Sequence, residues 1–474
     1  MKSIFWSGLF AAAVTVAASA APVLQLLQTG PTVVSVAQGA NGNATVDAKN
    51  GGTGTLSLQV TGSAPFLVPT VGAAHACSDG SGPGCLPVQI ALQTASLARG
   101  SYTGFVTVYD PNATDAPQII NVTAQVGTGV PDKLEFYVLQ GGSASARVFT
   151  TASGLVTATS SNQGLISVAQ DGGTPFSPSI PYKVTVNAGS LALGDYTGSV
   201  TIAGSTVTTD NKTIPVTIHV IKQSLTGPLA SLGGALNNAT YAVGESLAQG
   251  DIAAVFGSQF LTGSPAQSGV PLSTNVSGVQ VFLNDQPVPL YYVSAGQVNF
   301  QVPFNAQIGP GTLRVESNGQ RGNTISVTIA KAVPRILRLG GDFKDYGIVT
   351  NPDVSLTIPS ALGGRPPKVG DAIVIYAIGF GPASPAVDSG ATSPSAEPFA
   401  RLTNHPKVCF TAQTPFSAPL CVDPLFAGLA PGFIGLYQIN VVIPQGSPTG
   451  DIVPIRVVTD DGDTNTVNIA VQQQ

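Results

Sequence analysis

The feature that most limits how this chain can fold is a strand-like segment that occurs twice. Gln297–Pro303 reads QVNFQVP and Gln438–Pro444 reads QINVVIP, so each has the pattern Q-x-N, an alternating apolar series and a closing proline. Successive side chains of a strand point to opposite faces. The first copy therefore has an apolar face and an amide face, formed by Val298, Phe300 and Val302 and by Gln297, Asn299 and Gln301. The recurrence predicts one strand used twice, in two copies of one domain.

The composition indicates that the rest of the chain is also built from strands. Charged residues make up only 9% of the chain, against ~25% in ordinary soluble domains. Glycine (55 residues) and proline (37 residues) are dense, and short β-branched runs lie between them. Such runs bounded by turn-forming residues are typical of strands. A chain of 474 residues is expected to form roughly three to five domains. We predict an all-β protein of tandem Ig-like β-sandwich domains in an extended multidomain arrangement.

The N-terminal half contains its own repeat. Leu97–Val108 (LARGSYTGFVTV) matches Leu191–Ile202 (LALGDYTGSVTI), and Tyr102 and Tyr196 are 94 residues apart (196 − 102). That spacing suits one sandwich domain, so we predict domains at residues 21–126 and 127–224. The motif L-x-x-G-x-Y-T-G resembles that of the bacterial Ig-like modules known as BACON-type domains. Some of those modules carry a mid-domain tryptophan that neither copy has, which argues against carrying over a glycan-binding role.

The C-terminal half follows a polar linker at residues 222–228. Gly250-Asp251 before an apolar run recurs as Gly370-Asp371, in step with the repeated Q-x-N strand. We therefore predict an Ig-like or IPT-like sandwich at residues 229–332 and an Ig-like sandwich at residues 333–474. The second carries a Gly-, Pro- and Ser-rich insert at residues 379–430.

This half resembles the uncharacterised C-terminal domain family first noticed in Solibacter-type acidobacterial proteins. The resemblance covers residues ~230–471 and has specific motifs. They are Asn237–Tyr241 (NNATY), Gly250–Gly257 (GDIAAVFG), Pro289–Pro303 (PLYYVSAGQVNFQVP) and Ala430–Asn440 (APGFIGLYQIN). The resemblance implies no activity, because the family has none to carry over.

The first twenty residues predict export. Lys2 is followed by the apolar run at residues 4–17 and by Ala18-Ser19-Ala20, a small-residue cleavage site. The run is shorter than the ~20 residues that a membrane-spanning helix requires. We predict a signal peptide at residues 1–20 with cleavage near Ala20, a secreted or cell-surface location (extracellular or periplasmic), and no transmembrane span in the mature chain.

The four cysteines form two close pairs, Cys77/Cys85 and Cys409/Cys421, and each pair brackets a loop with glycine or proline. This spacing predicts two local disulfides in an oxidising compartment. Zinc is the alternative, but neither pair is C-x-x-C and the three histidines are far apart in the sequence. We predict no metal site and no cofactor.

Several kinds of chemistry lack their usual signals. A net charge of −5 without a basic stripe argues against nucleic-acid binding. No G-x-S-x-G motif occurs, as a serine hydrolase with a nucleophile elbow would have, and the four glutamates are isolated, where a glycosidase needs a facing carboxylate pair. The lone tryptophan, Trp6, falls in the predicted signal peptide. Tyr291, Tyr292 and Tyr437 could stack on a sugar instead, although alternating aromatics in a strand are typical of a core.

Two candidate sites remain. Asp460, Asp461, Asp463 and Asn465 could supply oxygen ligands to calcium, but their spacing matches no known calcium loop and a hairpin turn explains them. The repeated amides Gln297, Asn299, Gln438 and Asn440 could face a ligand. We favour a structural interpretation, in which Asn299 and Asn440 bond to the backbone of an adjacent loop.

These observations favour a secreted, non-enzymatic protein with a structural or adhesive extracellular role and no catalytic residues. Its partner is an unknown extracellular protein or a polysaccharide. The alternative is a carbohydrate- or cell-wall-binding protein, and an extracellular hydrolase is a third possibility that would need a carboxylate pair or a Ser/His pair to converge in space.

Overall fold

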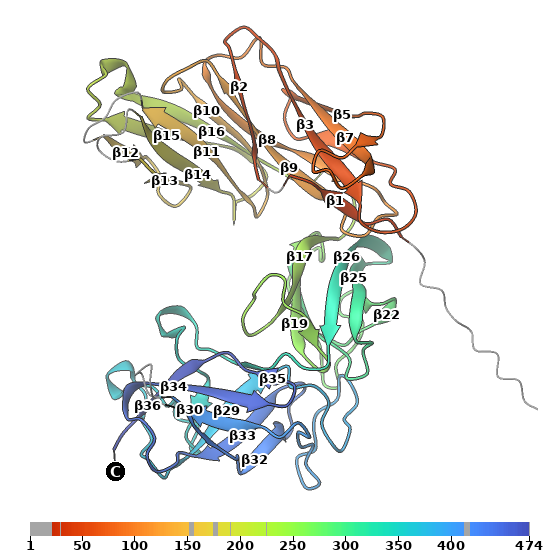
Figure 1. The fold of residues 1–474 in the computed structure, drawn as a ribbon, viewed down its shortest axis with the longest axis vertical. Helices are drawn as coiled ribbons and strands as arrows, with labels where there is room; N and C mark the ends of the chain where they lie inside the picture. Colours follow the sequence, from red (N-terminus) through yellow and green to blue (C-terminus); the bar gives the residue numbers. More distant parts are fainter. Residues whose placement is uncertain are drawn as a thin grey trace, which may run out of the picture. The chain divides into compact units, whose positions relative to one another are not determined.

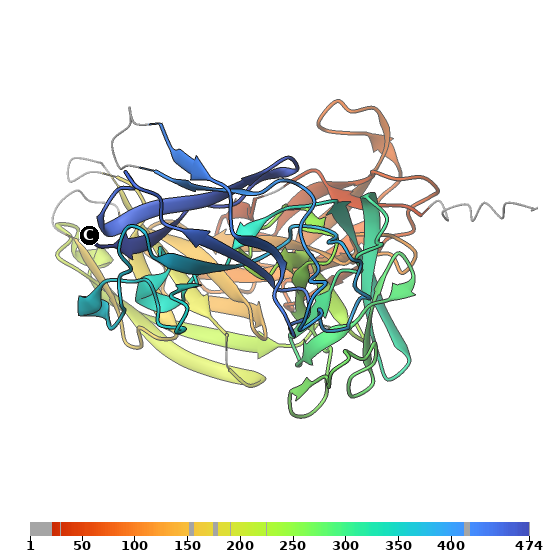
Figure 2. The ribbon, with the colours of Figure 1, turned by 90° about the horizontal axis from the view of Figure 1, so that it is seen from below.

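The computed structural model describes residues 21–28, 30–150, 156–173, 179–189, 191–223, 225–411 and 418–473. In these residues the regular structure is strand, apart from three single-turn 3-10 helices at Thr208–Asp210, Gly341–Phe343 and Ser360–Leu362. Strand arrows dominate both ribbon views (Figures 1 and 2). The predicted all-β class of tandem Ig-like sandwiches is confirmed. The predicted signal peptide at residues 1–20 lies outside the described residues.

The chain divides into two compact units, Met1–Lys222 and Gln223–Gln474. The first unit contains three main sheets. In one, the strand order is β1-β3-β7-β5 with β6 beside β7. Its strands are β1 (Leu24–Leu26), β3 (Gly42–Asn50), β5 (Leu67–Val71), β6 (His75–Ala76) and β7 (Pro83–Leu92).

The second sheet of this unit has eight strands in the order β12-β15-β16-β10-β8-β9-β2, with β4 beside β8. They are β2 (Thr32–Val36), β4 (Gln59–Gly62), β8 (Gly100–Tyr109), β9 (Gln118–Val126), β10 (Leu134–Leu139), β12 (Thr157–Ser160), β15 (Gly194–Ala203) and β16 (Lys212–Ile221). The third sheet, β11-β14-β13, consists of β11 (Ser143–Thr150), β13 (Ile166–Gln170) and β14 (Ile180–Asn187).

Strand β10 makes the eight-stranded sheet continuous through the first unit. It pairs in parallel with β16 on one side, where Leu134 is opposite Val216, and with β8 on the other, where Leu134 is opposite Ser101. Two hydrophobic cores therefore share one sheet: one contains Val106 from β8, and the other contains Val216 from β16. Figure 1 shows β8, β10 and β16 side by side.

The repeated tyrosine motif forms the same local structure in both halves of this unit. The hydroxyl of Tyr102 donates to the carbonyl of Ala98 (2.8 Å), and that of Tyr196 donates to the carbonyl of Ala192 (3.0 Å). A hydroxyl that bonds back to the chain a few residues upstream is the tyrosine corner of Ig-like sandwiches.

The second unit begins with a sandwich that we call the upstream sandwich. Its sheets have the orders β17-β19-β24-β23-β20 and β18-β26-β25-β21-β22. The strands are β17 (Leu229–Asn237), β18 (Leu247–Ala248), β19 (Ile252–Ser258), β20 (Ala266–Gln267), β21 (Val279–Leu283), β22 (Gln286–Pro287), β23 (Leu290–Val293), β24 (Gln297–Gln301), β25 (Gly309–Ser317) and β26 (Gln320–Ala330).

The downstream sandwich follows in the same unit. Its sheets are β27-β29-β33-β32, with β28 beside β29, and β31-β30-β34-β35, with β36 beside β34. The strands are β27 (Arg335–Ile336), β28 (Val349–Thr350), β29 (Ala372–Ile378), β30 (Lys407–Phe410), β31 (Leu420–Val422), β32 (Phe426–Leu429), β33 (Tyr437–Val442), β34 (Gly450–Thr459), β35 (Gly462–Asp463) and β36 (Val467–Val471).

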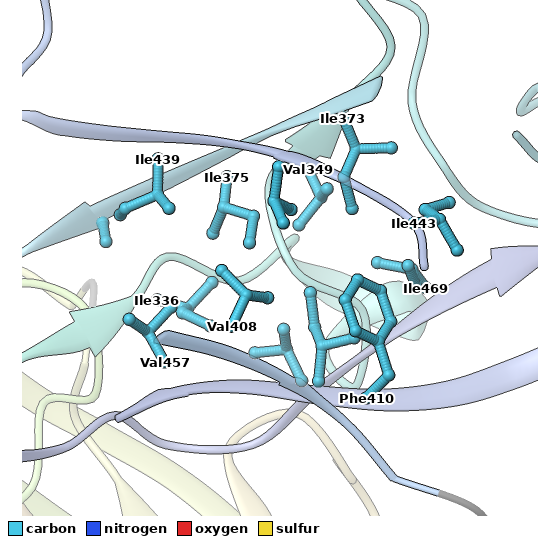
Figure 3. Packing of buried hydrophobic residues seen from close by; sticks show 14 of the residues in the cluster. Ile336, Val349, Ile373, Ile375, Val408, Phe410, Ile439, Ile443, Val457 and Ile469 are labelled. Carbon is cyan, nitrogen blue, oxygen red and sulfur yellow. The ribbon is translucent and has the colours of Figure 1, made fainter. Parts of the chain in front are cut away.

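The core of the downstream sandwich lies between its two sheets. Figure 3 shows Ile375 and Ile439 from one sheet facing Val408 and Val457 from the other. All four side chains are 0% exposed. The alternation read from the sequence produces this core, because every second residue of β29, β33 and β34 points inward.

The two Q-x-N strands occupy the same place in the two sandwiches. Strand β24 pairs antiparallel with β19 so that Asn299 is opposite Ala254, and β33 pairs with β29 so that Asn440 is opposite Val374. The apolar face of β24 is fully buried, as its pattern predicts. The bounds of the four domains read from the sequence stay a prediction, because the division of the chain at Lys222 tests none of them.

Candidate functional site

A fully buried carboxyl group lies in the turn that leads into β19. Gly250 has a φ of 77°, a left-handed conformation that glycine adopts without strain. Its N–H donates to the carbonyl of Val302 (3.0 Å), and the N–H of Val302 donates to the carbonyl of Asp251 (2.9 Å). The N–H of Asp251 donates in turn to the carbonyl of Ala248 (3.1 Å). These bonds tie the turn to the end of the repeated strand.

The downstream sandwich contains the same turn. Gly370 has a φ of 97°. Its N–H donates to the carbonyl of Ile443 (2.9 Å), and the N–H of Ile443 donates to the carbonyl of Asp371 (2.9 Å). The N–H of Asp371 donates to the carbonyl of Lys368 (3.0 Å). The two Gly-Asp turns thus have matching backbone hydrogen bonds.

The turns differ in what covers them. Asp251 is 0% exposed, whereas Asp371 is exposed. The downstream sandwich covers Asp251: a Cβ placed on Gly379, at the end of β29, would lie 3.6 Å from Asp251 Oδ1. Next to the turn, the ring of Phe304 packs against the core of the downstream sandwich, and a Cβ on Gly250 would lie 2.1 Å from that ring.

The Asp251 carboxyl group is only partly satisfied. Its Oδ2 accepts from Asn237 Nδ2 (2.8 Å) and from the N–H of Ala248 (3.4 Å), while Oδ1 is buried without a hydrogen-bond partner. Burial raises the pKa of Asp251 to about 7, because a charged carboxylate loses its hydration there, and the hydrogen bonds offset only part of this rise. The group can therefore hold a proton at mildly acidic pH.

Two tyrosines lie near this carboxyl group, one from each sandwich. The hydroxyl of Tyr291 on β23 donates to the carbonyl of Ile434 in the downstream sandwich (3.0 Å). The hydroxyl of Tyr437 on β33 donates to the carbonyl of Gly381. Burial raises the pKa of both hydroxyls, and the charge of Asp251 raises it further. Both tyrosines stay protonated and act as hydrogen-bond donors.

Gln301 joins the two sandwiches from the last position of β24. It is 0% exposed. Its Oε1 accepts from the N–H of Gly390 in the predicted insert (2.6 Å), and its Nε2 donates to the carbonyl of Gly250 (3.5 Å). Gly390 also accepts at its carbonyl from the N–H of Leu272 (2.8 Å), and Ser389 Oγ accepts from the N–H of Phe304 (3.0 Å). The described part of the insert is thus bonded to the upstream sandwich.

An ion pair lies at the edge of the same region. Arg335 Nη2 is 2.9 Å from Glu245 Oε1, and both side chains are mostly buried. Burial by itself would raise the pKa of Glu245, but hydrogen bonds from Arg335 and Thr240 bring it below its ordinary value. We call Asp251, Tyr291, Gln301, Gly390 and Tyr437 the polar junction. The arrangement can hold two sandwiches together and can bind or release one proton.

The repeated amides that the sequence singled out lie beside this junction and bond within their own strands. Gln297 Nε2 donates to Asn299 Oδ1 (2.7 Å), and Gln438 Nε2 donates to Asn440 Oδ1 (2.9 Å). We expected the asparagines to bond to the backbone of a loop, whereas in both copies the asparagine oxygen accepts from a side chain two residues away. The two copies share this geometry, and the structural interpretation of the amides stays a prediction.

Sequence reasoning missed the third amide. Gln301 corresponds to Val442 in the second copy, which is 38% exposed. The signal was present in the alignment of the two segments, because Gln301 occupies the position at which the second copy has the apolar Val442. Among the tyrosines considered for sugar stacking, Tyr437 is fully buried and Tyr291 is bonded through its hydroxyl.

The four candidate calcium ligands bond to separate neighbours. Asp460 Oδ2 is 2.6 Å from His405 Nδ1, Asp461 Oδ1 is 2.9 Å from Lys331 Nζ, Asp463 Oδ2 is 3.5 Å from Arg456 Nη1, and Asn465 Oδ1 accepts from the N–H of Ile336 (2.8 Å). The hydrogen bond from Lys331 holds the pKa of Asp461 below its usual range. Within the described residues no group of three or more His, Cys, Asp or Glu side chains could hold a metal ion.

Both predicted disulfides are present. Cys77–Cys85 closes the loop between β6 and β7, and Cys409–Cys421 joins directly opposite residues of β30 and β31. Such bonds persist in oxidising compartments, so the pairing supports a location outside the cytosol.

A second cluster of ionisable side chains lies in the first unit, on β10, β15 and β16. His219 Nδ1 is 2.7 Å from Asp195 Oδ1 and His219 Nε2 is 3.3 Å from Glu135 Oε1. The His219 ring stacks on Tyr137 with 4.3 Å between centroids, and burial followed by the charge of Glu135 raises the pKa of Tyr137 to about 12. These contacts brace the strand that makes the large sheet continuous.

Comparisons with known proteins do not assign the chain to a family. No protein-family model and no curated protein matches it. Among solved structures, it is similar to the I-band fragment I67–I69 of titin at 10% identity and a TM-score of 0.15, covering 66% of this chain and 100% of that one. It is also similar to domains 4–9 of the surface-layer protein SbsC at 14% identity and a TM-score of 0.17, covering 96% of this chain and 82% of that one. At these values we draw nothing about function from the likeness. Among the residues that the structure describes, none forms a helix long and apolar enough to cross a membrane.

Proposed function

We propose that this protein is a non-enzymatic, extracellular structural or adhesive protein in which the sandwiches within each of its two units are joined. The proposal rests on the position of the buried polar groups, which lie where sandwiches meet. In the second unit, Gln301 and Tyr291 contact backbone groups of the neighbouring sandwich, and in the first unit β10 extends one sheet through both cores. Polar groups of this kind would line a cleft in an enzyme, whereas here they join sandwiches.

Joining of this kind suits a mechanical or scaffolding role. Interfaces between domains of one chain usually permit relative motion unless they are large and hydrophobic. A continuous sheet and a buried hydrogen-bonded junction both restrict such motion. Relative movement would break buried hydrogen bonds, and each buried donor or acceptor left without a partner costs about 1–3 kcal/mol of stability. Restricted motion within each unit would hold exposed surfaces at a set spacing.

The extracellular part of the proposal rests on chemistry as well as on the N-terminal pattern. The two disulfides favour an oxidising compartment, and the signal-peptide prediction points the same way. The resemblances to BACON-type modules and to the Solibacter-type C-terminal family stay predictions and contribute no activity to the proposal.

The first test is a deletion of the gene in the source organism combined with cell fractionation. We expect the tagged wild-type protein in the surface or extracellular fraction, and we expect the deleted strain to lose cell attachment or envelope integrity until the wild-type chain is restored. A cytosolic location, or a deletion without effect on either property, would contradict the proposal.

The second test separates this function from its rivals with the purified chain, residues 21–474. The proposal expects no retention on cell-wall or storage polysaccharides and no release of reducing sugars from them. Saturable retention would favour the carbohydrate-binding alternative. Sugar release that tracks the protein through purification would favour a hydrolase.

A further inference from the structure

The polar junction holds the two C-terminal sandwiches together, and it also contains the fully buried, titratable carboxyl group of Asp251. We propose that the junction responds to pH: it is closed while Asp251 is protonated, and it loosens between the two C-terminal sandwiches when Asp251 loses its proton. This inference does not depend on the proposed function, since it concerns how the two sandwiches of the second unit hold together whatever the chain does.

The surroundings of the Asp251 side chain stabilise a neutral carboxylic acid better than an ionised carboxylate. Asp251 is 0% exposed, and its Oδ1 has no hydrogen-bond partner. The Oδ2 atom is bonded to Asn237, a neutral amide, at 2.8 Å. Oδ1 of an ionised carboxylate in that place would be charged and buried without a hydrogen-bond partner. The nearby backbone N–H of Ile252 lowers the pKa of Asp251 but offsets only part of the rise caused by burial, so the carboxylate is more costly there than the neutral acid.

The charged and titratable groups that face Asp251 do little to stabilise its ionised form. From β23 and β33 come the hydroxyls of Tyr291 and Tyr437, which are neutral and already donate to the carbonyls of Ile434 and Gly381. From β27 comes Arg335, whose charge favours the ionised form.

That cation is already engaged elsewhere. Arg335 pairs with Glu245 at 2.9 Å and donates to the carbonyl of Pro334 at 2.8 Å. The field that Arg335 exerts on Asp251 is therefore partly cancelled by Glu245.

The direction of the effect follows from linkage. Burial raises the pKa of Asp251 from 3.8 to about 7, so the folded junction holds a proton that the opened junction releases at mildly acidic pH. The stabilisation is therefore fully present below the ordinary carboxyl pKa and is lost as the pH rises to about 7. Above that value the junction carries a buried charge and relieves it by opening toward water.

The downstream sandwich covers this carboxyl group. The ionisation of Asp251 therefore affects the contact between the two C-terminal sandwiches. Gly379 at the end of β29 lies against Asp251 Oδ1, and Phe304 beside the turn packs into the downstream core. Movement of this cover would expose Asp251 to water on the side of the downstream sandwich. Asp371 provides a matched control in the same molecule, because its turn has the same hydrogen bonds and its side chain is exposed.

The experiment is hydrogen exchange measured by mass spectrometry on the chain from residue 21 to 474 at pH 5 and pH 8, with rates corrected for the intrinsic effect of pH. The probe is the peptide that contains Gly390, whose N–H is bonded to Gln301. The reference is a peptide that covers β29, residues 372–378. We expect protection of the Gly390 amide to fall at least tenfold at pH 8, which corresponds to about 1.4 kcal/mol, while the reference changes less than twofold.

Two variants locate the cause. Asp251→Asn keeps the shape without the titration, so we expect Gly390 to be equally protected at both pH values and better protected than in the wild type at pH 8. Asp371→Asn should keep the wild-type pH response. If Asp251→Asn does not fold, the wild-type series alone decides the outcome. Unchanged protection of Gly390 in the wild type, an equal loss at the reference peptide, or a persistent response in a folded Asp251→Asn protein would each overturn the proposal.

Discussion

The two Gly-Asp turns of the C-terminal unit share their sequence, their left-handed glycine and their hydrogen bonds, yet they differ in environment. Gly370 and Asp371 face solvent, whereas Gly250 and Asp251 are buried beneath the downstream sandwich. The difference shows that a duplicated sandwich can keep its local structure while one copy acquires a junction.

Four pairs of substitutions compare the contribution of corresponding or neighbouring residues to stability. Each pair is measured by urea unfolding of residues 21–474, with hydrogen exchange read separately for each sandwich.

The largest contrast is expected for the glycines. Gly250→Ala should cost about 3 kcal/mol of stability in the upstream sandwich, because a Cβ at a left-handed position is strained and here also overlaps a packed ring. The ring is that of Phe304. Gly370→Ala should cost about 1 kcal/mol, since Gly370 has a left-handed φ and is exposed, so backbone strain is the expected cost. Equal costs would mean that the Phe304 ring yields freely, which would weaken the case for a tightly packed junction.

The next contrast exchanges the fifth residue of the repeated segment, which is Gln301 in the first copy and Val442 in the second. Gln301→Val should cost about 2 kcal/mol, because the buried N–H of Gly390 loses its acceptor. The reverse change, Val442→Gln, should alter stability by less than about 0.5 kcal/mol, since that side chain is on the surface. A neutral Gln301→Val variant would contradict the role of this amide.

A smaller effect is expected for Tyr291, whose hydroxyl donates to the downstream sandwich. Tyr291→Phe should cost about 1 kcal/mol through the lost hydrogen bond to the carbonyl of Ile434, and the loss should be greatest in exchange of the segment at residues 430–437. Tyr292→Phe, on the same strand, leaves that bond intact and serves as the control. A larger effect in the control would place the important hydroxyl elsewhere.

The smallest effect should be the same in both copies. Gln297→Ala and Gln438→Ala each remove one half-buried hydrogen bond between neighbouring amides, so each should cost roughly 0.5 kcal/mol. We expect the two substitutions to lower stability by the same amount. A difference above about 1 kcal/mol would show that the junction also depends on the first amide of the strand.

Much of the fold followed from local patterns. Alternation in the segment Gln297–Pro303 placed Val298, Phe300 and Val302 in a core, and all three are 0% exposed. The cysteine spacing gave both disulfides, because short loops bring their ends together whatever the remaining fold. Such features depend on residues that are near in sequence, so pattern and spacing suffice.

The candidate site could be predicted much less well. The amides Gln297 and Asn299 attracted attention as polar residues in a strand, yet they bond to each other. Gln301 and Asp251 were not singled out as site residues, because their importance depends on Gly390 and Gly379, which are remote in the sequence. The four oxygen-bearing residues at 460–465 were grouped by proximity in the chain, whereas their ion pairs and hydrogen bonds take them to different partners.

The sequence by itself determined the strands, their inward and outward faces and the duplication, because side-chain alternation and turn chemistry act over a few residues. Only the tertiary structure decided that one of two equal turns is buried. Burial is set by what packs on top, and the cover over Asp251 comes from a second sandwich. That cover removes water from one carboxyl group and leaves its twin hydrated, so the same dipeptide becomes a junction in one place and a surface turn in the other.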